Sequence, residues 1–297
     1  MNNHLTTVGM GEALWDVLPE GKKIGGAPAN FAYHISQFGL SSQVVSAVGE
    51  DELGKEIQEN FRQKQLKFLM ESVPYPTGTV SVKLDAKGIP WYDIKENVAW
   101  DNIPFTPTLE ELARRTQAVC FGSLAQRNRV SRETISRFLD AMPDTNETLK
   151  IFDINLRQEF YTKDILENSF CKCNILKIND EELAVISVLF NLPHTSLQER
   201  CRALLTRYHL KMLILTCGTD GSYVFTPGNL SFAETPKVEV ADTVGAGDSF
   251  TATFVASILK GKSLEEAHRL AVEVSAYVCT QHGAMPTLPD YLKAKLS

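Results

Sequence analysis

The chain lacks the long apolar runs and the basic clusters that mark two large classes of protein. No apolar run in its 297 residues reaches the roughly 18–20 residues that cross a bilayer. The formal net charge is −6, and no run rich in lysine or arginine stands out. Nucleic-acid affinity comes largely from neutralising phosphates, so we expect no nucleic-acid partner. Because no apolar run is long enough to span a bilayer, we also expect no association with a membrane.

The six cysteines have no paired spacing of the kind that zinc sites use. Cys171 and Cys173 are too close together and too isolated to specify a metal, and most of the six read as small buried side chains. The first four residues lack the basic head and apolar stretch of a secretion signal. Reduced thiols without an export signal predict a cytoplasmic protein.

Two common nucleotide-binding motifs are also missing. The Gly-Lys-Ser run at 261–263 lacks the upstream glycine of a P-loop. Gly-Met-Gly at 9–11 begins a dinucleotide-like fingerprint, but Leu14 occupies the position of the third glycine. These departures argue against a P-loop enzyme and against a nicotinamide enzyme.

Short apolar runs alternate with amphipathic stretches from residue 5 onward, which favours an α/β fold with helices on both sides of a central parallel sheet. Runs such as 212–215 are apolar without alternation, as in parallel strands that are covered on both faces. The predicted strands are 5–10, 43–48, 118–122, 149–154, 174–178 and 212–217. The predicted helices are 28–38, 52–64, 131–141, 180–190, 196–208, 247–260, 264–281 and 289–295. We expect one domain, 1–297.

Residues 78–94 depart from this order and alternate like an antiparallel ribbon. Val80, Val82 and Leu84 point one way before a turn at 87–88. Because a two-stranded ribbon cannot bury its apolar side alone, we expect it to cover the active site, another subunit, or both.

The run DTVGAGDSF at 242–250 predicts a phosphate-binding turn that opens a helix. Gly245, Ala246 and Gly247 can bring three consecutive backbone N–H groups close to a ligand, and a helix N-terminus attracts anions. Asp248 follows in the first turn, where a carboxylate can accept the proton of a hydroxyl that attacks phosphorus. Taken alone, the run could equally be an ordinary helix start after a glycine-rich turn.

A second glycine cluster, GGAPAN at 25–30, also precedes a predicted helix. Together, residues 25–54 and 242–250 resemble the two signature regions of the PfkB (ribokinase-like) family of carbohydrate kinases. The resemblance begins at GEALWD, residues 11–16, and reaches the C-terminal helices.

The resemblance implies a three-layer αβα sandwich of the ribokinase-like type with a small β-sheet lid. The lid would be formed mainly by about 12–24 and 76–105. In this family such a lid closes over the sugar and often mediates dimerisation, so a homodimer through the lid is expected.

For the sugar, the resemblance implies contacts from residues that can accept, donate or leave room for hydroxyl groups. Arg157 could clamp an oxygen-rich substrate with its planar guanidinium, although an exposed salt bridge explains it equally well. Without the resemblance, a turn explains Asp16 and a first helical turn explains Asn30. The implied set is Asp16, Gly25, Gly26, Asn30, Trp91, Arg157 and Asp248.

For the nucleotide, Asn179 and Glu182 resemble the family's NxxE motif, which implies that they organise Mg²⁺ and its waters near the phosphates. The alternative is an acidic helix start, which the helix dipole favours. Asp242 and the carbonyl of Val244 are implied ligands of a monovalent cation such as K⁺. The implied ATP contacts are Thr216, Gly218, Gly221, Gly245, Gly247 and Gly283.

The sequence is therefore expected to encode an ATP-dependent sugar kinase that transfers the γ-phosphoryl group to a primary hydroxyl. D-fructose is the first substrate, because GEALWD, GGAPAN and DINLR most resemble bacterial fructokinases. A 2-keto-3-deoxygluconate kinase is the alternative, since Arg157 could meet a carboxylate; ribose and nucleosides rank lower. A hypothesis from a different functional class is a sugar or nucleotide sensor without catalytic activity. The intact GAGD at 245–248 argues against it.

Overall fold

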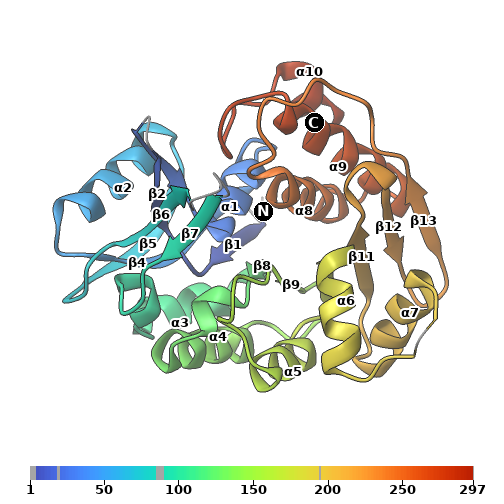
Figure 1. Ribbon diagram of the computed structural model, residues 1–297, viewed down its shortest axis with the longest axis horizontal. Helices are drawn as coiled ribbons and strands as arrows, with labels where there is room; N and C mark the ends of the chain where they lie inside the picture. Colours follow the sequence, from blue (N-terminus) through green and yellow to red (C-terminus); the bar gives the residue numbers. More distant parts are fainter. Residues whose placement is uncertain (1–4, 19–20, 85–89, 194, 297) are drawn as a thin grey trace.

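The computed structural model describes residues 5–18, 21–84, 90–193 and 195–296 and contains two β-sheets (Figure 1). The larger sheet has nine strands in the order β13-β12-β11-β10-β9-β8-β1-β4-β5. Among the described strands of this sheet, β12 alone runs in the opposite direction and is antiparallel to both β11 and β13. Its strands are β1 (Thr6–Met10), β4 (Ser41–Gly49), β5 (Lys67–Val73), β8 (Thr116–Phe121), β9 (Leu149–Asp153), β10 (Ile175–Asn179), β11 (Met212–Thr216), β12 (Ser222–Phe225) and β13 (Leu230–Ala233).

Helices cover both faces of this sheet, and α8 and α9 are seen on the opposite side of β8 and β9 from α3, α4 and α5 in Figure 1. Along β8, Cys120 packs in the cluster with α1, α8 and α9, whereas Phe121 packs in the cluster with α3 to α7. This alternation follows from the two-residue period of a strand. The helices are α1 (Ala27–Ser36), α2 (Glu52–Gln63), α3 (Pro107–Arg114), α4 (Arg129–Ala141), α5 (Lys163–Lys172), α6 (Asp180–Leu189), α7 (Leu197–Arg207), α8 (Ala246–Leu259), α9 (Leu264–Cys279) and α10 (Asp290–Lys293).

The smaller sheet has the order β3-β2-β6-β7. It combines β2 (Leu14–Leu18), β3 (Gly21–Gly25), β6 (Gly78–Leu84) and β7 (Pro90–Ile94), so the expected ribbon joins a second hairpin through parallel β2 and β6. Asp16 lies within β2, which corrects the expectation of a turn after the first strand. The side chain of Trp91 lies outside the described residues. The role of this sheet as a lid stays a prediction.

Every predicted strand and helix overlaps an observed element, but several other helices and strands were not predicted from the sequence. Helix α5, with the sequence KDILENSFCK, contains weak helix formers, and the Thr162 side chain caps its N-terminus. The strands β5 and β13 lie at the two edges of the large sheet and carry polar side chains. Among the described residues, no helix is long and apolar enough to cross a membrane.

Candidate active site

A left-handed glycine sets the start of α8. Gly245 has φ of 80° and precedes the first helical residue, Ala246. A Cβ at Gly245 would lie 2.7 Å from both Cα and Cβ of Ala284, so packing as well as backbone conformation requires glycine there. The Ala246 N–H donates a 3.3 Å hydrogen bond to the carbonyl of Thr243. The turn thereby fixes the direction in which α8 presents its first amides.

Asp248 stands in the first turn of α8 and meets a side chain from α1. Asn30 Nδ2 donates a 2.7 Å hydrogen bond to Asp248 Oδ2, which joins the two glycine clusters of the sequence. Burial, and then the nearby charge of Asp153, raises the pKa of Asp248 to about 6, while the Asn30 hydrogen bond and Lys177 oppose the shift. A carboxylate in this state is charged at neutral pH yet basic enough to accept a proton.

A buried ion pair lies beneath the glycine turn, and the sequence analysis did not identify it. Lys177 Nζ on β10 lies 3.2 Å from Asp153 Oδ1 on β9. A Cβ at Gly247 would lie 3.2 Å from the same Nζ, so the ammonium group sits against the backbone of the turn. Burial lowers the pKa of Lys177, but the carboxylates of Asp153, Glu182 and Asp248 outweigh it and hold that pKa above its usual value.

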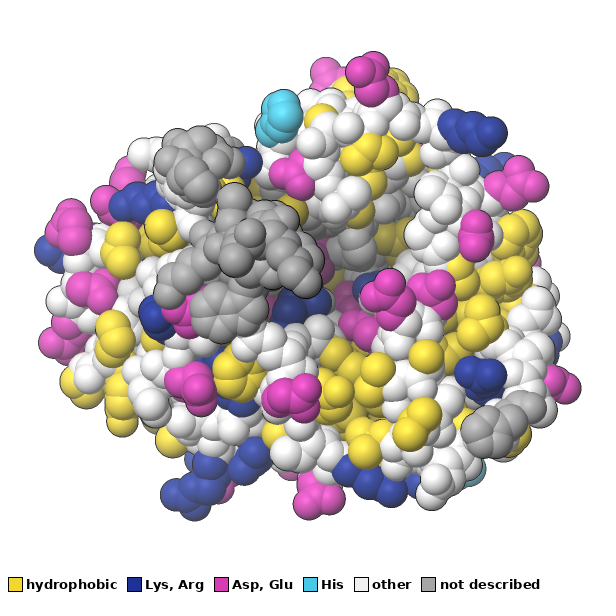
Figure 2. Space-filling view, viewed as in Figure 1, with side chains coloured by type: hydrophobic (Ala, Val, Ile, Leu, Met, Phe, Trp, Pro, Cys, Tyr) yellow, Lys and Arg dark blue, Asp and Glu magenta, His cyan; other side chains and the backbone are white. Residues whose placement is uncertain are grey.

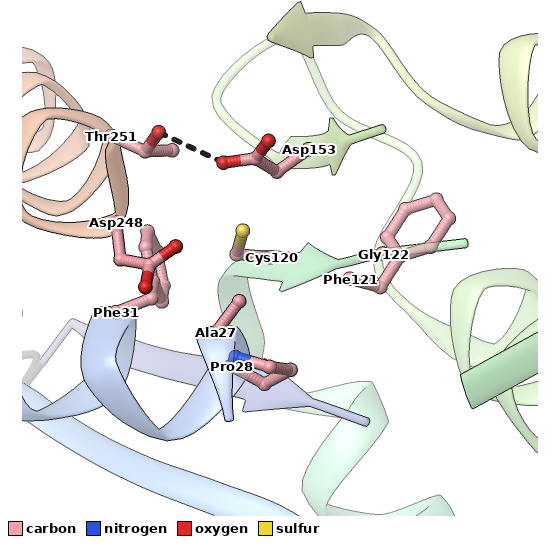
Figure 3. A pocket seen from close by; sticks show the side chains of 9 residues that line it. All are labelled: Ala27, Pro28, Phe31, Cys120, Phe121, Gly122, Asp153, Asp248 and Thr251. Atoms are coloured by element: carbon pink, nitrogen blue, oxygen red, sulfur yellow. Dashed lines mark hydrogen bonds between the residues drawn. The ribbon is translucent and has the colours of Figure 1, made fainter. Parts of the chain in front are cut away.

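Figure 3 shows how Asp248 and Asp153 approach each other across a small cavity. Thr251 Oγ1, one turn further along α8, donates a 3.3 Å hydrogen bond to Asp153 Oδ2. Burial and the surrounding carboxylates raise the pKa of the Cys120 thiol, which therefore stays protonated and is no nucleophile. The cavity is lined by Ala27, Pro28, Phe31, Cys120, Phe121, Gly122, Asp153, Asp248 and Thr251.

The sugar side of the site contains a second residue that the sequence analysis missed, Glu12. Burial raises its pKa to about 7, the charge of Asp248 adds to the shift, and Arg157 opposes it. Its buried Oε2 has no hydrogen-bond partner among the described residues. Burial likewise raises the pKa of Asp16 to about 6, and Arg157 and Lys23 oppose that shift. The positive charge of Arg157 thus acts on three carboxyl groups. Figure 2 shows acidic and basic side chains together in a hollow of the molecule.

The glycines at 25 and 26 are required by close packing. A Cβ at Gly25 would lie 2.4 Å from Asp16 Oδ2, and one at Gly26 would lie 2.3 Å from the Glu12 carbonyl oxygen. Gly26 also has φ of 115°. These contacts bring the N-terminus of α1 against β2, so Asp16, Gly26 and Asn30 belong to one corner of the molecule.

On the nucleotide side, Asn179 and Glu182 cap α6. Asn179 Oδ1 accepts the Glu182 N–H at 2.7 Å, and Glu182 Oε2 accepts the Asn179 N–H at 2.9 Å. Glu182 Oε1 also accepts the Leu156 N–H at 2.9 Å. The acidic helix start is therefore present, and the two residues also form a capping box. Each carboxylate oxygen of Glu182 still has a lone pair with which it can accept a hydrogen bond from water on Mg²⁺, so the magnesium role stays a prediction.

The remaining nucleotide candidates fall at two neighbouring places. Thr216 is paired with Asn179 across β11 and β10, and Gly218 and Gly221 follow with φ of 53° and 98°. Asp242 accepts the Val244 N–H at 3.0 Å and the Gly283 N–H at 3.1 Å. Its carboxylate is thus engaged by backbone donors beside the Gly245 turn. The described residues contain no cluster of three or more acidic, His or Cys side chains suited to a metal ion.

Comparisons with known proteins agree with this geometry. Residues 19–291 match the model of the pfkB family carbohydrate kinases. The ATP-dependent 6-phosphofructokinase of Thermoanaerobacterium thermosaccharolyticum is 28% identical over 91% of this chain and 83% of that protein. The fructokinase of Salmonella typhimurium is 27% identical over 94% and 95% of the two chains. The fructokinase of Xylella fastidiosa with bound ATP has a TM-score of 0.84 over 98% and 97% of the chains at 19% identity, which shows that the fold is ribokinase-like.

Proposed function

Because the chain belongs to the pfkB family of carbohydrate kinases, we propose that it transfers the γ-phosphoryl group of ATP to a primary hydroxyl of D-fructose. The observation that carries the proposal is the 2.7 Å hydrogen bond between Asn30 and Asp248. It brings together a sugar-binding candidate and a base from segments that lie 218 residues apart.

In this proposal Asp248 orients the attacking hydroxyl and accepts its proton. Its raised pKa of about 6 keeps it ionised at neutral pH while making it a stronger base than an ordinary aspartate. The N–H groups of Gly245, Ala246 and Gly247 stabilise the charge on the transferring group. The Ala246 N–H would exchange its 3.3 Å bond to Thr243 for the phosphoryl oxygen.

Lys177 supplies a fixed positive charge next to the same amides. The ammonium group is buried beside the Gly247 backbone and is held by Asp153, so it needs little rearrangement when negative charge develops above it. Mg²⁺, carried by the ATP phosphates, would meet Asn179 and Glu182 through its waters. It would neutralise phosphate charge, and Lys177 would act from the opposite side of the turn.

The charges on the sugar side support a neutral sugar. Arg157 is near enough to Glu12, Asp16 and Asp248 to lower the pKa of each, so an anionic substrate bound by Arg157 would also be near these carboxyl groups. The raised pKa values of Glu12 and Asp16 also leave part of each protonated near neutral pH, which lets a carboxyl group both donate to and accept from hydroxyls. A fructokinase among the relatives fits this interpretation.

An acidic sugar is the second candidate, because Lys23 as well as Arg157 lies close enough to Asp16 to affect its pKa. Two cations at that point could bind the carboxylate of 2-keto-3-deoxygluconate. A relative named 5-dehydro-2-deoxygluconokinase, 24% identical, acts on a sugar derivative of related structure by its name. Arg157→Lys keeps the charge but loses the planar guanidinium, so it would weaken the binding of an acidic sugar more than the binding of fructose.

The test is ATP consumption with fructose, 2-keto-3-deoxygluconate, tagatose, ribose, adenosine and fructose 6-phosphate, compared by kcat/KM. We expect fructose to rank first. Another sugar ahead of it by about tenfold, or 1.4 kcal/mol of transition-state binding, would overturn the substrate but not the kinase. ATP or sugar binding without sugar-dependent ATP consumption would instead support the sensor.

The predicted monovalent-cation site remains part of the proposal. Asp242, the Val244 carbonyl and Gly283 lie next to the Gly245 turn, so a cation there would act on the anion-binding amides through the backbone. We expect faster turnover in potassium chloride than in tetramethylammonium chloride at equal ionic strength. Equal rates in the two salts would remove the cation from the mechanism. The dimer through the smaller sheet and a cytoplasmic location likewise stay predictions; the six cysteines, all of them described, are free.

A further inference from the structure

A buried histidine on α1 binds the loop that covers the Gly245 turn. His34 lies one helical turn beyond Asn30, is fully buried, and has its Nε2 2.8 Å from the carbonyl oxygen of Ala284. Since a carbonyl oxygen only accepts, Nε2 is the donor and Nδ1 carries the lone pair, which faces Gln37 Nε2 at 3.5 Å. Burial lowers the pKa of His34 to about 4, so the ring is neutral near neutral pH.

Ala284 passes this contact on to the anion-binding turn. A Cβ at Gly245 would lie 2.8 Å from the Ala284 carbonyl oxygen, the same atom that His34 binds. The residue is therefore held between the imidazole of α1 and the left-handed glycine that begins α8. Any movement of Ala284 would change the room available to Gly245 and with it the direction of the following amides.

Helix α1 thus reaches the two halves of the reaction centre by separate bonds. Asn30 contacts the base Asp248 directly, and His34 contacts the amide turn through Ala284. We propose that His34 is a positioning residue for phosphoryl transfer, which holds the Gly245 turn, and with it the first amides of α8, in place against α1. This inference rests on the proposed kinase function. A misplacement of about 1 Å can reduce turnover by about a hundredfold, so a contact of this kind is large enough to matter.

A purely structural role is the competing explanation, and the chain contains an example of one. His268 on α9 is also buried, with Nε2 2.8 Å from Ser222 Oγ and Nδ1 2.8 Å from Ser231 Oγ. Burial lowers its pKa to about 4 as well. It joins α9 to β12 and the edge strand β13, and its ring packs on Phe250 of α8 with centroids 5.9 Å apart; none of its hydrogen bonds goes to Ala284 or the Gly245 turn. Its loss should affect stability alone.

The experiment compares His34→Leu with His34→Gln, whose amide nitrogen can replace Nε2 as the donor. Leucine fills the space without a donor and leaves the Ala284 carbonyl unpaired. We expect His34→Leu to lower kcat about tenfold or more with the sugar KM changed less than about threefold, and His34→Gln to recover most of the loss. Each variant is assayed well below its own Tm, so that kcat refers to folded protein.

Two controls separate positioning from stability. His268→Leu removes a buried histidine elsewhere and should lower Tm with kcat unchanged. Gln37→Met removes the hydrogen bonds of Gln37 to the Pro286 carbonyl and the Leu288 N–H, which hold the same loop further along, and the 3.5 Å contact with His34 Nδ1, but it leaves the donor from His34 to Ala284 in place. It too should leave kcat within about threefold of the wild type.

Three outcomes would overturn the inference: unchanged kcat in His34→Leu, no recovery in His34→Gln, or an equal loss in Gln37→Met. If His34→Leu does not fold, Ala284→Gly removes the methyl group that packs on Gly245 without touching α1. It should lower kcat and leave the sugar KM unchanged. An unchanged kcat in this variant would likewise contradict the positioning role. A wild-type protein that phosphorylates no sugar would be a failure of the proposed function, not of this contact.

Discussion

The two helical layers that cover the large sheet differ in what they bury. Beneath α3 to α7, aromatic rings form a continuous series, with Phe121–Phe152, Phe152–Phe170 and Phe170–Phe190 centroids 5.2, 5.7 and 5.4 Å apart. On the other face, α8 contributes small polar side chains to its fully buried surface, among them Ser249, Thr251, Thr253 and Ser257. Hydroxyls of this kind bond back to the preceding helical turn and let neighbouring helices approach closely.

The difference teaches that stability and chemistry are unequally divided between the layers. Apolar burial in the aromatic layer is favourable at about 25 cal/mol per Å². Asp248 lies at the start of α8 in the polar layer, and Glu12 and Asp16 come from the segment leading into the smaller sheet; the pKa values of all three are raised because burial disfavours their charged forms. Charge held out of water at these positions is unfavourable for folding but useful to a base. A variant in the aromatic layer should therefore lose stability and keep its turnover, whereas a variant in the polar layer should lose turnover and keep its stability.

The largest expected effect is on turnover and comes from a variant in the polar layer. Asp248→Asn should lower kcat by about 10²–10⁴-fold, because an amide cannot accept the hydroxyl proton. Its Tm at pH 7.5 should stay the same or rise, since the buried charge disappears while Asn30 keeps an oxygen to donate to. The measurements are steady-state kinetics and thermal unfolding. Asp164→Asn, an exposed aspartate in the first turn of α5, is the matched control. Near-wild-type turnover in Asp248→Asn would remove the residue from the role of base.

The next effect breaks the aromatic layer instead. Phe170→Ala removes a fully buried ring that contacts Phe152, Phe190 and Tyr208 and should reduce the free energy of unfolding by about 3–5 kcal/mol. Turnover per folded molecule should remain near the wild-type value. Denaturant unfolding measures the first quantity and kinetics at low temperature the second. The exposed Tyr291→Ala should change stability by less than about 0.5 kcal/mol. A large loss of kcat in folded Phe170→Ala would mean that the layers are not separate.

The smallest expected effect is a shift in the pH dependence of kcat/KM, which depends on the carboxyl groups around Asp248. Because Asp248 must be ionised to act, kcat/KM should fall as pH drops through about 6. Burial is the main cause of that raised pKa and Asp153 the second, so Asp153→Asn should move the acid limb to lower pH. The exposed Asp140→Asn serves as control. Glu12 and Asp16 titrate in the same range, so the limb belongs to the group of carboxyls. An acid limb that stays in place in Asp153→Asn would exclude this electrostatic coupling.

Much of the architecture could be predicted because its signals are local. The periodic helices, the continuous apolar strands and the glycine turn before Asp248 depend on residues close in sequence. Helix α3 was missed because its eight residues are about two turns, and α5 because it contains weak helix formers. The edge strand β13 has only four residues, too few to show an alternating pattern. The turn that explains Asp16 without the family resemblance is wrong, because nothing in GEALWD by itself indicates that β2 leaves the large sheet and pairs with β6.

The sequence by itself determined which chemical groups are present and where glycine leaves the backbone without a side chain. Tertiary structure decided which groups meet. Lys177 reads as one residue of an apolar strand, and Glu12 as part of a turn, until strand pairing and the approach of α1 place them around Asp248. The reason is physical: a pKa, a buried ion pair and a contact such as His34 to Ala284 depend on separation in space and on exclusion of water. Neither quantity is a function of distance along the chain.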